Sequence, residues 1–255
     1  MQTQAVEDYL KAIYELQAGQ KQVSTTALSE RLAVAPASVT GMVKKLAAMK
    51  LVDHQPYQGV TLKPAGEKIA LEVVRHHRLV ESYLSEALGV PWDQVHAEAD
   101  KWEHVLSEDM EDRIDALLGH PTTDPHGAPI PARDGSLPPG EFRRLVDVPP
   151  GETAVVAEVS DHDPALLRYL GDMGLYPRAE VKVVSAAPFE GPVTVRVGKA
   201  EHALGREVAG HILVSVSAAP RSSGDPSPPS EFKPTCPALT PSCSGPEAEV
   251  QRVVC

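Results

Sequence analysis

The chain has 255 residues, of which 42% are hydrophobic, so it is long enough to bury the cores of one or two domains. A formal net charge of -11 excludes a protein that coats nucleic acid indiscriminately. Residues 1–75, however, carry nine Lys or Arg against seven Asp or Glu, so any DNA binding is expected in this first third.

The sequence also limits the compartment and the type of metal site. It has no apolar run of roughly eighteen residues. Its start, MQTQAVEDYL, has neither a basic region nor an apolar core, so we expect a cytoplasmic protein without membrane contact. A metal site in the folded part would use nitrogen and oxygen ligands, because the cysteines all lie in the last twenty residues. They are Cys236, Cys243 and Cys255.

The first third of the chain has the pattern of a winged helix-turn-helix. Apolar residues recur at helical spacing over 6–17. In the segment 23–52, Ser24 or Thr25 can cap a second helix and Pro36 can begin a third. The segment 51–70 then reads as a strand, a glycine-containing turn and a strand, followed by a helix that begins at Pro64.

We expect the helix that begins at Pro36 to enter the major groove of DNA. Ser38 and Thr40 would reach bases or phosphates, and Lys44 and Lys45 would face the phosphate backbone. A glycine at position 41 costs about 1 kcal/mol relative to alanine in a helix, so it either permits a close approach to DNA or is simply tolerated. The alternatives are a small helical domain that only packs and a winged helix that contacts proteins. The expected DNA-binding residues are Thr26, Pro36, Ala37, Ser38, Thr40, Gly41, Lys44 and Lys45.

The remainder of the chain divides into a helical part, a linker, a β part and a tail. Three helices are predicted at 64–88, 91–106 and 107–118, and the first of them could be interrupted. Proline and glycine predict a linker over 119–141. Short Val-rich segments then predict a barrel of five or six strands, and the Pro-rich segment from 220 to 255 is predicted to be disordered. Strands are expected at 152–160, 179–186, 192–198 and 211–217.

The predicted fold is therefore mainly α with a small β domain. We expect a winged helix-turn-helix DNA-binding domain over 1–72 and a helical dimerisation and metal-binding domain, with its linker, over 73–141. An SH3-like domain would occupy 142–218, and a disordered tail would occupy 219–255.

A polar stripe on the second of the three predicted helices suggests a metal site. His96, Asp100, Glu103 and His104 stand at i, i+4, i+7 and i+8, which places all four on one helical face. Two more candidate ligands, His77 and Glu81, are four residues apart in the preceding helix. Carboxylates with imidazoles suit manganese, iron or zinc. The alternative is an ordinary polar face with internal i, i+4 pairs.

The order of these segments resembles the diphtheria toxin repressor family of metal-dependent transcriptional repressors. The resemblance covers roughly residues 4–217 and is carried by HRLVE, WEH and PHGAPIP, and by LGREVAGHILV in the β part, which is similar to ferrous-transport accessory domains. It implies an activating site of Asp8, Asp100, Glu103 and His104. It implies an ancillary site of His77, Glu81 and His96 with carboxylates from the third domain, where Glu158 and Asp161 match best and His162 competes.

Departures from the family pattern bear on the identity of the metal. Iron-responsive members have Met and Cys ligands where this chain has Asp8 and Asp100, and harder ligands favour Mn(II). Fe(II) and other divalent ions could still bind. Two-domain manganese regulators have a second acidic ligand where this chain has Lys11. In the anion pocket of the iron-responsive branch Arg78 is retained, but Asp124 and Ala128 replace a hydroxyl and an amide group.

The function expected from the resemblance is that of a repressor that binds palindromic operators as a homodimer when Mn(II), or Fe(II), is plentiful, and so controls metal uptake. Two other classes compete with it. A metal-independent winged-helix regulator would bind DNA regardless of a chelator. A metallohydrolase would need an open coordination position and a base, but the sequence contains neither HExxH nor G-x-S-x-G.

Overall fold

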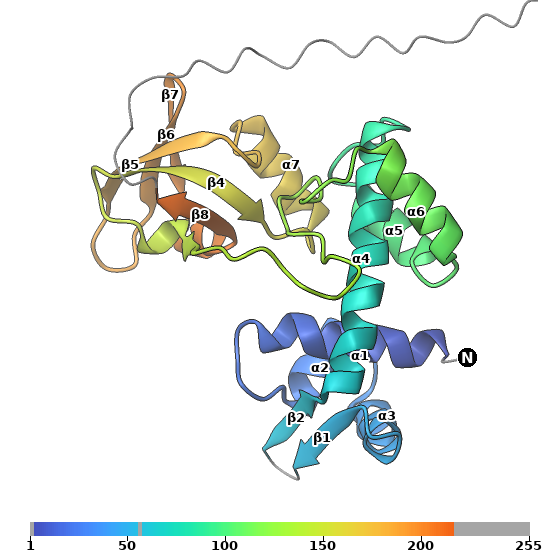
Figure 1. Cartoon of the computed structure of the whole chain (residues 1–255). Coiled ribbons are helices and arrows are strands. Elements are labelled where there is room, and N and C mark those ends of the chain that lie inside the picture. The colour runs from blue at the N-terminus through green and yellow to red at the C-terminus, as the bar shows by residue number, and fades with distance from the viewer. Residues whose placement is uncertain (1–2, 56–57, 217–255) are drawn as a thin grey trace, which may run out of the picture. The chain divides into compact units, whose positions relative to one another are not determined.

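The computed structural model describes residues 3–55 and 58–216 (Figure 1). The predicted tail over 219–255, with its three cysteines, lies outside these residues. Within the described ranges, no helix combines the length and the apolar character that crossing a membrane requires. The fold is mainly α with a β domain at its C-terminal end, as the sequence predicts.

The N-terminal domain is a winged helix-turn-helix. It contains α1 (Gln4–Gln17), α2 (Thr25–Arg31) and α3 (Pro36–Ala48), followed by the antiparallel strands β1 (Val52–Gln55) and β2 (Gly59–Leu62). Ser24 caps α2 by accepting a hydrogen bond from the Ala27 backbone N–H at 3.0 Å. The apolar faces of α1 to α3 meet in one core that includes Leu10, Ile13, Leu28, Val39 and Leu46. Each predicted element of this domain is confirmed.

Helix α4 (Pro64–Glu86) is continuous and joins the N-terminal domain to the helical domain (Figure 1). Its first half contributes Ala70 to the N-terminal core, and its second half packs Val80 and Leu84 against Val95 of α5 (Val95–Trp102). The predicted interruption is absent from α4.

The helix predicted over 91–106 is shorter at both ends in the structure, where α5 covers Val95–Trp102. Residues 92–94 form turns, in which Gln94 N–H donates to the Pro91 carbonyl, so Pro91 opens a turn and not a helix. At the other end, Ser107 must be extended because its side chain caps α6 (Glu108–Leu117), and the chain leaves the α5 helix before that point. Glu103 and His104 therefore lie in the turn after α5 and not on its face.

The predicted linker over 119–141 is only partly a linker. Asp124, His126, Ala128 and Ile130 are buried, and residues 123 and 129 form an antiparallel bridge. The Asp124 carboxylate folds this turn by accepting the backbone N–H groups of His126 and Ala128 at 2.8 and 3.0 Å. Gly127 has a φ of +91°, and a Cβ there would lie 1.9 Å from the Ala157 carbonyl oxygen, so only glycine permits this contact with the β domain.

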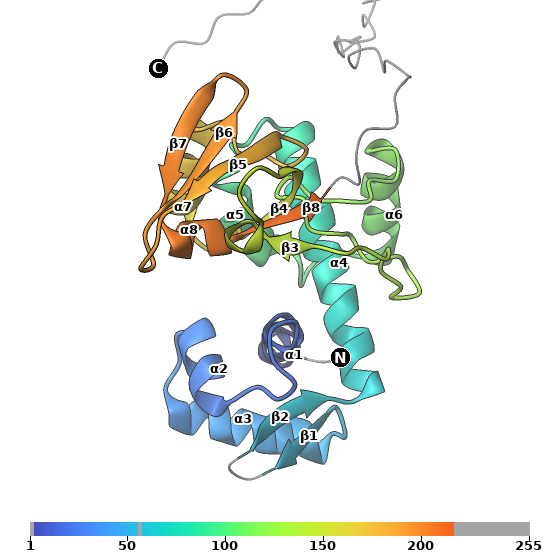
Figure 2. The same ribbon diagram turned by 90° about the vertical axis from the view of Figure 1, so that its left-hand side faces the viewer.

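The C-terminal domain is a six-stranded antiparallel sheet in the order β3-β8-β4-β5-β6-β7 (Figure 2). The four predicted strands correspond to β4 (Thr153–Val159), β5 (Glu180–Ala186), β6 (Val193–Val197) and β8 (Ile212–Val216). A core of alternating Val residues and of Leu167 and Leu170 from α7 (Pro164–Asp172) fills the domain. The sequence did not predict β3 (Arg143–Arg144), β7 (Ala200–Leu204), the 3-10 helix η1 (Leu145–Asp147), α7 or α8 (Arg206–Gly210).

Candidate metal centre

Three of the four residues assigned to the activating site lie together. Asp8 from α1 and Glu103 and His104 from the turn after α5 place one potential ligand atom each within 4.8 Å of the others. Nε2 of His104 lies 2.7 Å from Oδ1 of Asp8 and 3.3 Å from Oε1 of Glu103. We call these three residues the junction cluster, because they join the N-terminal domain to the helical domain.

The fourth assigned residue, Asp100, belongs to a neighbouring group. Its carboxylate gathers with Glu103 and His77, and the ammonium of Lys11 lies among them. Lys11 donates to Oε2 of Glu103 at 2.7 Å and to Oδ1 of Asp100 at 3.2 Å. Glu103 is thus shared, with Oε1 facing the junction cluster and Oε2 facing Lys11.

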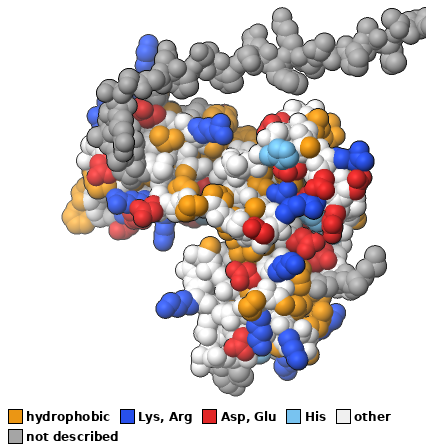
Figure 3. All heavy atoms as spheres, in the orientation of Figure 1, with side chains coloured by type: hydrophobic (Ala, Val, Ile, Leu, Met, Phe, Trp, Pro, Cys, Tyr) orange, Lys and Arg blue, Asp and Glu red, His pale blue; other side chains and the backbone are white. Residues whose placement is uncertain are grey.

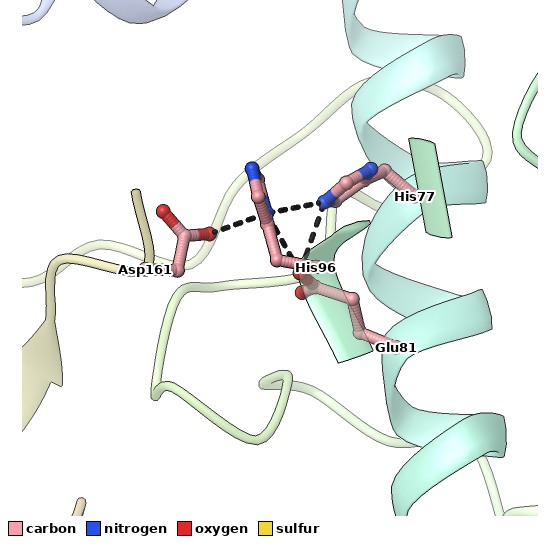
Figure 4. A group of neighbouring side chains, drawn as sticks. All are labelled: His77, Glu81, His96 and Asp161. Carbon is pink, nitrogen blue, oxygen red and sulfur yellow. Dashed lines mark hydrogen bonds and ion pairs between the residues drawn. The ribbon is translucent and has the colours of Figure 1, made fainter. Parts of the chain in front are cut away.

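The residues assigned to the ancillary site also gather, with the exception of Glu158. His77 and Glu81 from α4, His96 from α5 and Asp161 from the segment after β4 form one group of potential ligands (Figure 4). His96 lies between the others, with its Nδ1 3.3 Å from Asp161, 3.1 Å from Glu81 and 3.0 Å from His77. Glu158 and His162 line the cleft of about 540 Å³ beside this group.

Glu81 also belongs to a further group with Asp124 and His126, two residues that the sequence analysis does not place in a metal site. All three side chains are buried, and among the described residues Glu81 Oε2, Asp124 Oδ2 and His126 Nδ1 have no hydrogen-bond partner. His126 Nε2 lies 2.7 Å from the Trp92 carbonyl oxygen, which can only accept, so Nε2 carries a proton and Nδ1 faces Glu81 at 3.7 Å. Together with His96 and Asp161, these three residues form what we call the inner cluster.

Buried oxygen and nitrogen atoms without a hydrogen-bond partner are costly, and a bound cation would remove that cost. The signal in the sequence is the i, i+2 spacing of Asp124 and His126 within DPHGAPIP, although the high proline content of the segment favours a linker. Only the fold brings that turn against Glu81.

In the inner cluster, imidazoles lie next to the carboxylates. Burial opposes a charged His96, but its hydrogen bonds to Asp161 and Glu81 outweigh burial and raise its pKa to about 10. Burial likewise opposes a charged His126, and Glu81 raises that pKa to about 9. Burial and the charge of Glu81 raise the pKa of Asp124 to about 7. Protons on these groups therefore balance part of the negative charge.

The buried ion pairs between α4 and α6 differ from the candidate metal sites, because an arginine balances the buried carboxylate. Arg75 donates to Oε1 of Glu111 at 2.5 Å and to the Pro131 carbonyl at 2.9 Å, and His76 lies 3.1 Å from Oε2 of Glu111. Acidic and basic side chains also alternate on the surface of this helical domain (Figure 3). Because Arg75 already balances Glu111, this network needs no metal and holds α6 on α4.

The residues assigned to DNA binding are all exposed, on α2 and α3. Val39, Val43 and Leu46 bury the opposite face of α3. Thr40 donates its hydroxyl hydrogen to the Pro36 carbonyl at 3.0 Å, so its oxygen can still accept. A Cβ at Gly41 would meet nothing within 4 Å, so packing within this chain does not require glycine there. The exposed residues are Thr26, Pro36, Ala37, Ser38, Thr40, Gly41, Lys44 and Lys45.

Comparison with protein-family models assigns each of the three domains. Residues 1–60 match the iron-dependent repressor N-terminal DNA-binding domain, and residues 63–132 match the iron-dependent repressor metal-binding and dimerisation domain. Residues 143–216 match the FeoA domain.

Known proteins match most of the chain. The iron-dependent repressor IdeR of Mycobacterium leprae is 33% identical over 220 residues, which cover 82% of this chain and 95% of that protein. A manganese-dependent transcriptional repressor in complex with manganese is 40% identical with a TM-score of 0.80, over 83% of this chain and 100% of that one. The manganese regulator SloR is 30% identical with a TM-score of 0.72, over 83% and 98% of the two chains.

Proposed function

The chain belongs to the iron-dependent repressor family, and from that premise we propose that Mn(II) is the cation to which it responds. As a member of this family it is a metal-dependent transcriptional repressor that binds DNA, binds metal ions and dimerises. Because family members are transcriptional repressors and not enzymes, a metallohydrolase is set aside. Its binding to operator DNA favours a cytoplasmic location.

We propose that the junction cluster, with Asp100 as a further ligand, is the activating position. The observation that carries this assignment is the 2.7 Å contact between His104 of the helical domain and Asp8 of α1. Burial raises the pKa of Asp8, so its charged form is unfavourable without a partner cation. A divalent cation bound there would neutralise the carboxylates and hold the two domains in one relative pose.

The inner cluster is the proposed second position. Its atoms without a hydrogen-bond partner, on Glu81, Asp124 and His126, would be ligands, with Asp161 and His96 beside them. His77 remains a candidate through its contacts with Glu81 and His96, and Glu158 is a candidate from the wall of the cleft. Because Asp161 follows β4, this position would tie the third domain to α4. We also propose that the three domains cover residues 1–72, 73–141 and 142–218.

The ligand chemistry supports manganese over softer ions. Every candidate ligand in the two positions is a carboxylate or an imidazole, which suits Mn(II) better than a thiophilic ion. The repressor in complex with manganese, 40% identical to this chain, supports the same assignment. Fe(II) shares this ligand preference and is the second candidate; other divalent metals would bind in vitro.

The residues of the junction cluster suggest how metal binding controls DNA binding. Lys11 balances Asp100 and Glu103 in part, but Asp8 of α1 still faces the charge of Glu103 when no divalent cation is bound, which weakens the contact between α1 and the turn after α5. If a bound metal favours the DNA-competent pose, DNA must tighten metal binding by the same factor, typically about 1–3 kcal/mol. A two-fold dimer would then place two α3 helices on a palindromic operator of metal-uptake genes.

The experiment that tests this function is selection of DNA from a random duplex library by the purified protein, with Mn(II), with anaerobic Fe(II) or with chelator. We expect a palindrome to be enriched with metal and not with chelator. Asp8→Ala should abolish the enrichment, and Asp172→Ala, at an exposed position on α7, should retain it. Equal enrichment with chelator would indicate a metal-independent regulator. Activation at lower free Fe(II) than free Mn(II) would contradict the assignment of manganese.

A further inference from the structure

Lys11 is a cation already built into the cluster of candidate metal ligands. Its side chain is almost fully buried in α1, and its ammonium lies 2.7 Å from Glu103, 3.2 Å from Asp100 and 2.9 Å from Nδ1 of His77. Glu103, Asp100 and His77 are themselves one of the groups whose ligand atoms could hold a metal ion. The ammonium therefore occupies the space among three potential ligands.

The shared carboxylate of Glu103 makes this position the neighbour of the junction cluster. One oxygen, Oε1, lies 3.3 Å from His104, and the other, Oε2, lies 2.7 Å from Lys11. A carboxylate bridging two cation positions is the arrangement of a paired-metal site. In this chain one of the two positions is filled by a side chain.

The charge balance fits one divalent ion beside Lys11. Asp8, Asp100 and Glu103 carry three negative charges and Lys11 carries one positive charge, which leaves two negative charges. Two further carboxylates contact imidazoles of this region and not Lys11: Glu7 contacts His104, and Glu81 contacts His77. An acidic residue in place of Lys11 would leave four negative charges and would add a ligand.

We propose that Lys11 replaces a second metal ion, so that the domain junction binds one divalent cation and not a pair. This inference rests on the proposed activating position. Lys11 sets the number of bound metal ions, because its ammonium neutralises Glu103 and Asp100 and excludes a cation from the space among them. It also holds the ligands of the metal-free protein together.

The test counts Mn(II) ions per chain by equilibrium dialysis and measures the electron paramagnetic resonance spectrum of the bound ions. Lys11→Glu should bind one more Mn(II) than the wild type and should show the exchange-coupled spectrum of two ions bridged by a carboxylate. Lys68→Glu, the same charge change at an exposed position of α4, should match the wild type. An unchanged count in Lys11→Glu, or an exchange-coupled pair in the wild type, would overturn the inference.

Asp8→Ala separates this inference from the proposed activating position. If Asp8→Ala binds as many ions as the wild type, the activating position itself is wrong. If Asp8→Ala loses one ion and Lys11→Glu gains none, only the role of Lys11 is wrong.

Lys11→Met keeps the inference testable if the glutamate variant does not fold. It retains most of the buried stem and removes the charge, so the melting temperature of the metal-free protein should fall and that of the Mn(II)-loaded protein should fall less. Equal losses in both states would show that Lys11 only packs and would overturn the inference.

Discussion

Glu7 and His104, 97 positions apart in the chain, are joined by a 2.7 Å contact between Oε2 of Glu7 and Nδ1 of His104. A carboxylate accepts the Nδ1 proton, which fixes the ring tautomer and leaves Nε2 free to face Asp8. Glu7→Ala should therefore weaken Mn(II) binding at the junction cluster by roughly 10- to 100-fold, as loss of such an orienting partner commonly does. Isothermal titration calorimetry measures this effect.

Glu7→Gln is the informative companion variant, because its amide oxygen can still accept the Nδ1 proton. We expect it to retain most of the affinity that Glu7→Ala loses. Glu98→Ala removes a carboxylate from the exposed pair with Lys101 on α5 and serves as the charge-matched control. If all three variants lose affinity equally, Glu7 acts through net charge and not by orienting His104.

Gly127 controls the inner cluster through the close contact of its turn with β4. Gly127→Ala places a Cβ 1.9 Å from the Ala157 carbonyl oxygen and should displace Asp124 and His126 from Glu81. We expect the chain to lose one Mn(II) per chain while the ion that depends on Asp8 is retained. Equilibrium dialysis measures the number of Mn(II) ions bound per chain.

Gly119→Ala separates backbone strain from the clash. Gly119 also has a positive φ, +72°, but an added Cβ would meet nothing within 4 Å. Both variants should lose about 1–2 kcal/mol of stability to left-handed strain, and only Gly127→Ala should lose the ion. Retention of that ion in Gly127→Ala would remove the turn from the proposed second position.

Local sequence patterns predicted the fold class and the candidate ligands of the two helical stripes, which are His77, Glu81, His96, Asp100, Glu103 and His104. The N-terminal helices and the Val-rich strands follow from apolar periodicity, because each buries one face. The sequence placed Glu103 and His104 on a helix that in fact ends at Trp102, since the cap of α6 at Ser107 overrides the helical spacing. Residue spacing could not show that Lys11 lies among the ligands or that His126 meets Glu81, because the contact partners lie far apart in the chain.

The pH dependence of the metal-free protein follows from its charged imidazoles. His96 and His126 have pKa values raised to about 10 and about 9, above the ordinary 6.5. A raised folded-state pKa contributes stability that is fully present below pH 6.5 and is lost as the pH rises through 9 and 10. The melting temperature of the metal-free protein should therefore fall over this window.

Mn(II) binding should show the opposite trend, because a cation must displace those protons. Affinity for the second position should rise by roughly tenfold per pH unit for each proton displaced, up to the same window. Calorimetry in buffers of different ionisation enthalpy counts the protons released. Release of none would show that the imidazoles of the inner cluster are not ligands.

Replacing Gly41 with alanine should raise the stability of the protein and weaken its binding to DNA. It lies in the middle of α3 on the exposed face, and an added Cβ would meet nothing within 4 Å. Gly41→Ala should therefore stabilise the protein by about 1 kcal/mol, the difference in helix propensity. If α3 enters the major groove at this point, the added methyl should weaken operator binding by roughly 1 kcal/mol or more.

Gly205→Ala is the matched control, since Gly205 also has open space at its Cβ and a negative φ but lies before α8 in the third domain. It should leave operator affinity unchanged in fluorescence anisotropy titrations with saturating Mn(II). A Gly41→Ala protein that is more stable and binds the operator as tightly as the wild type would place the protein–DNA contact elsewhere on α3. Weaker binding with higher stability would show that glycine is kept there for the approach of DNA, because folding alone favours alanine.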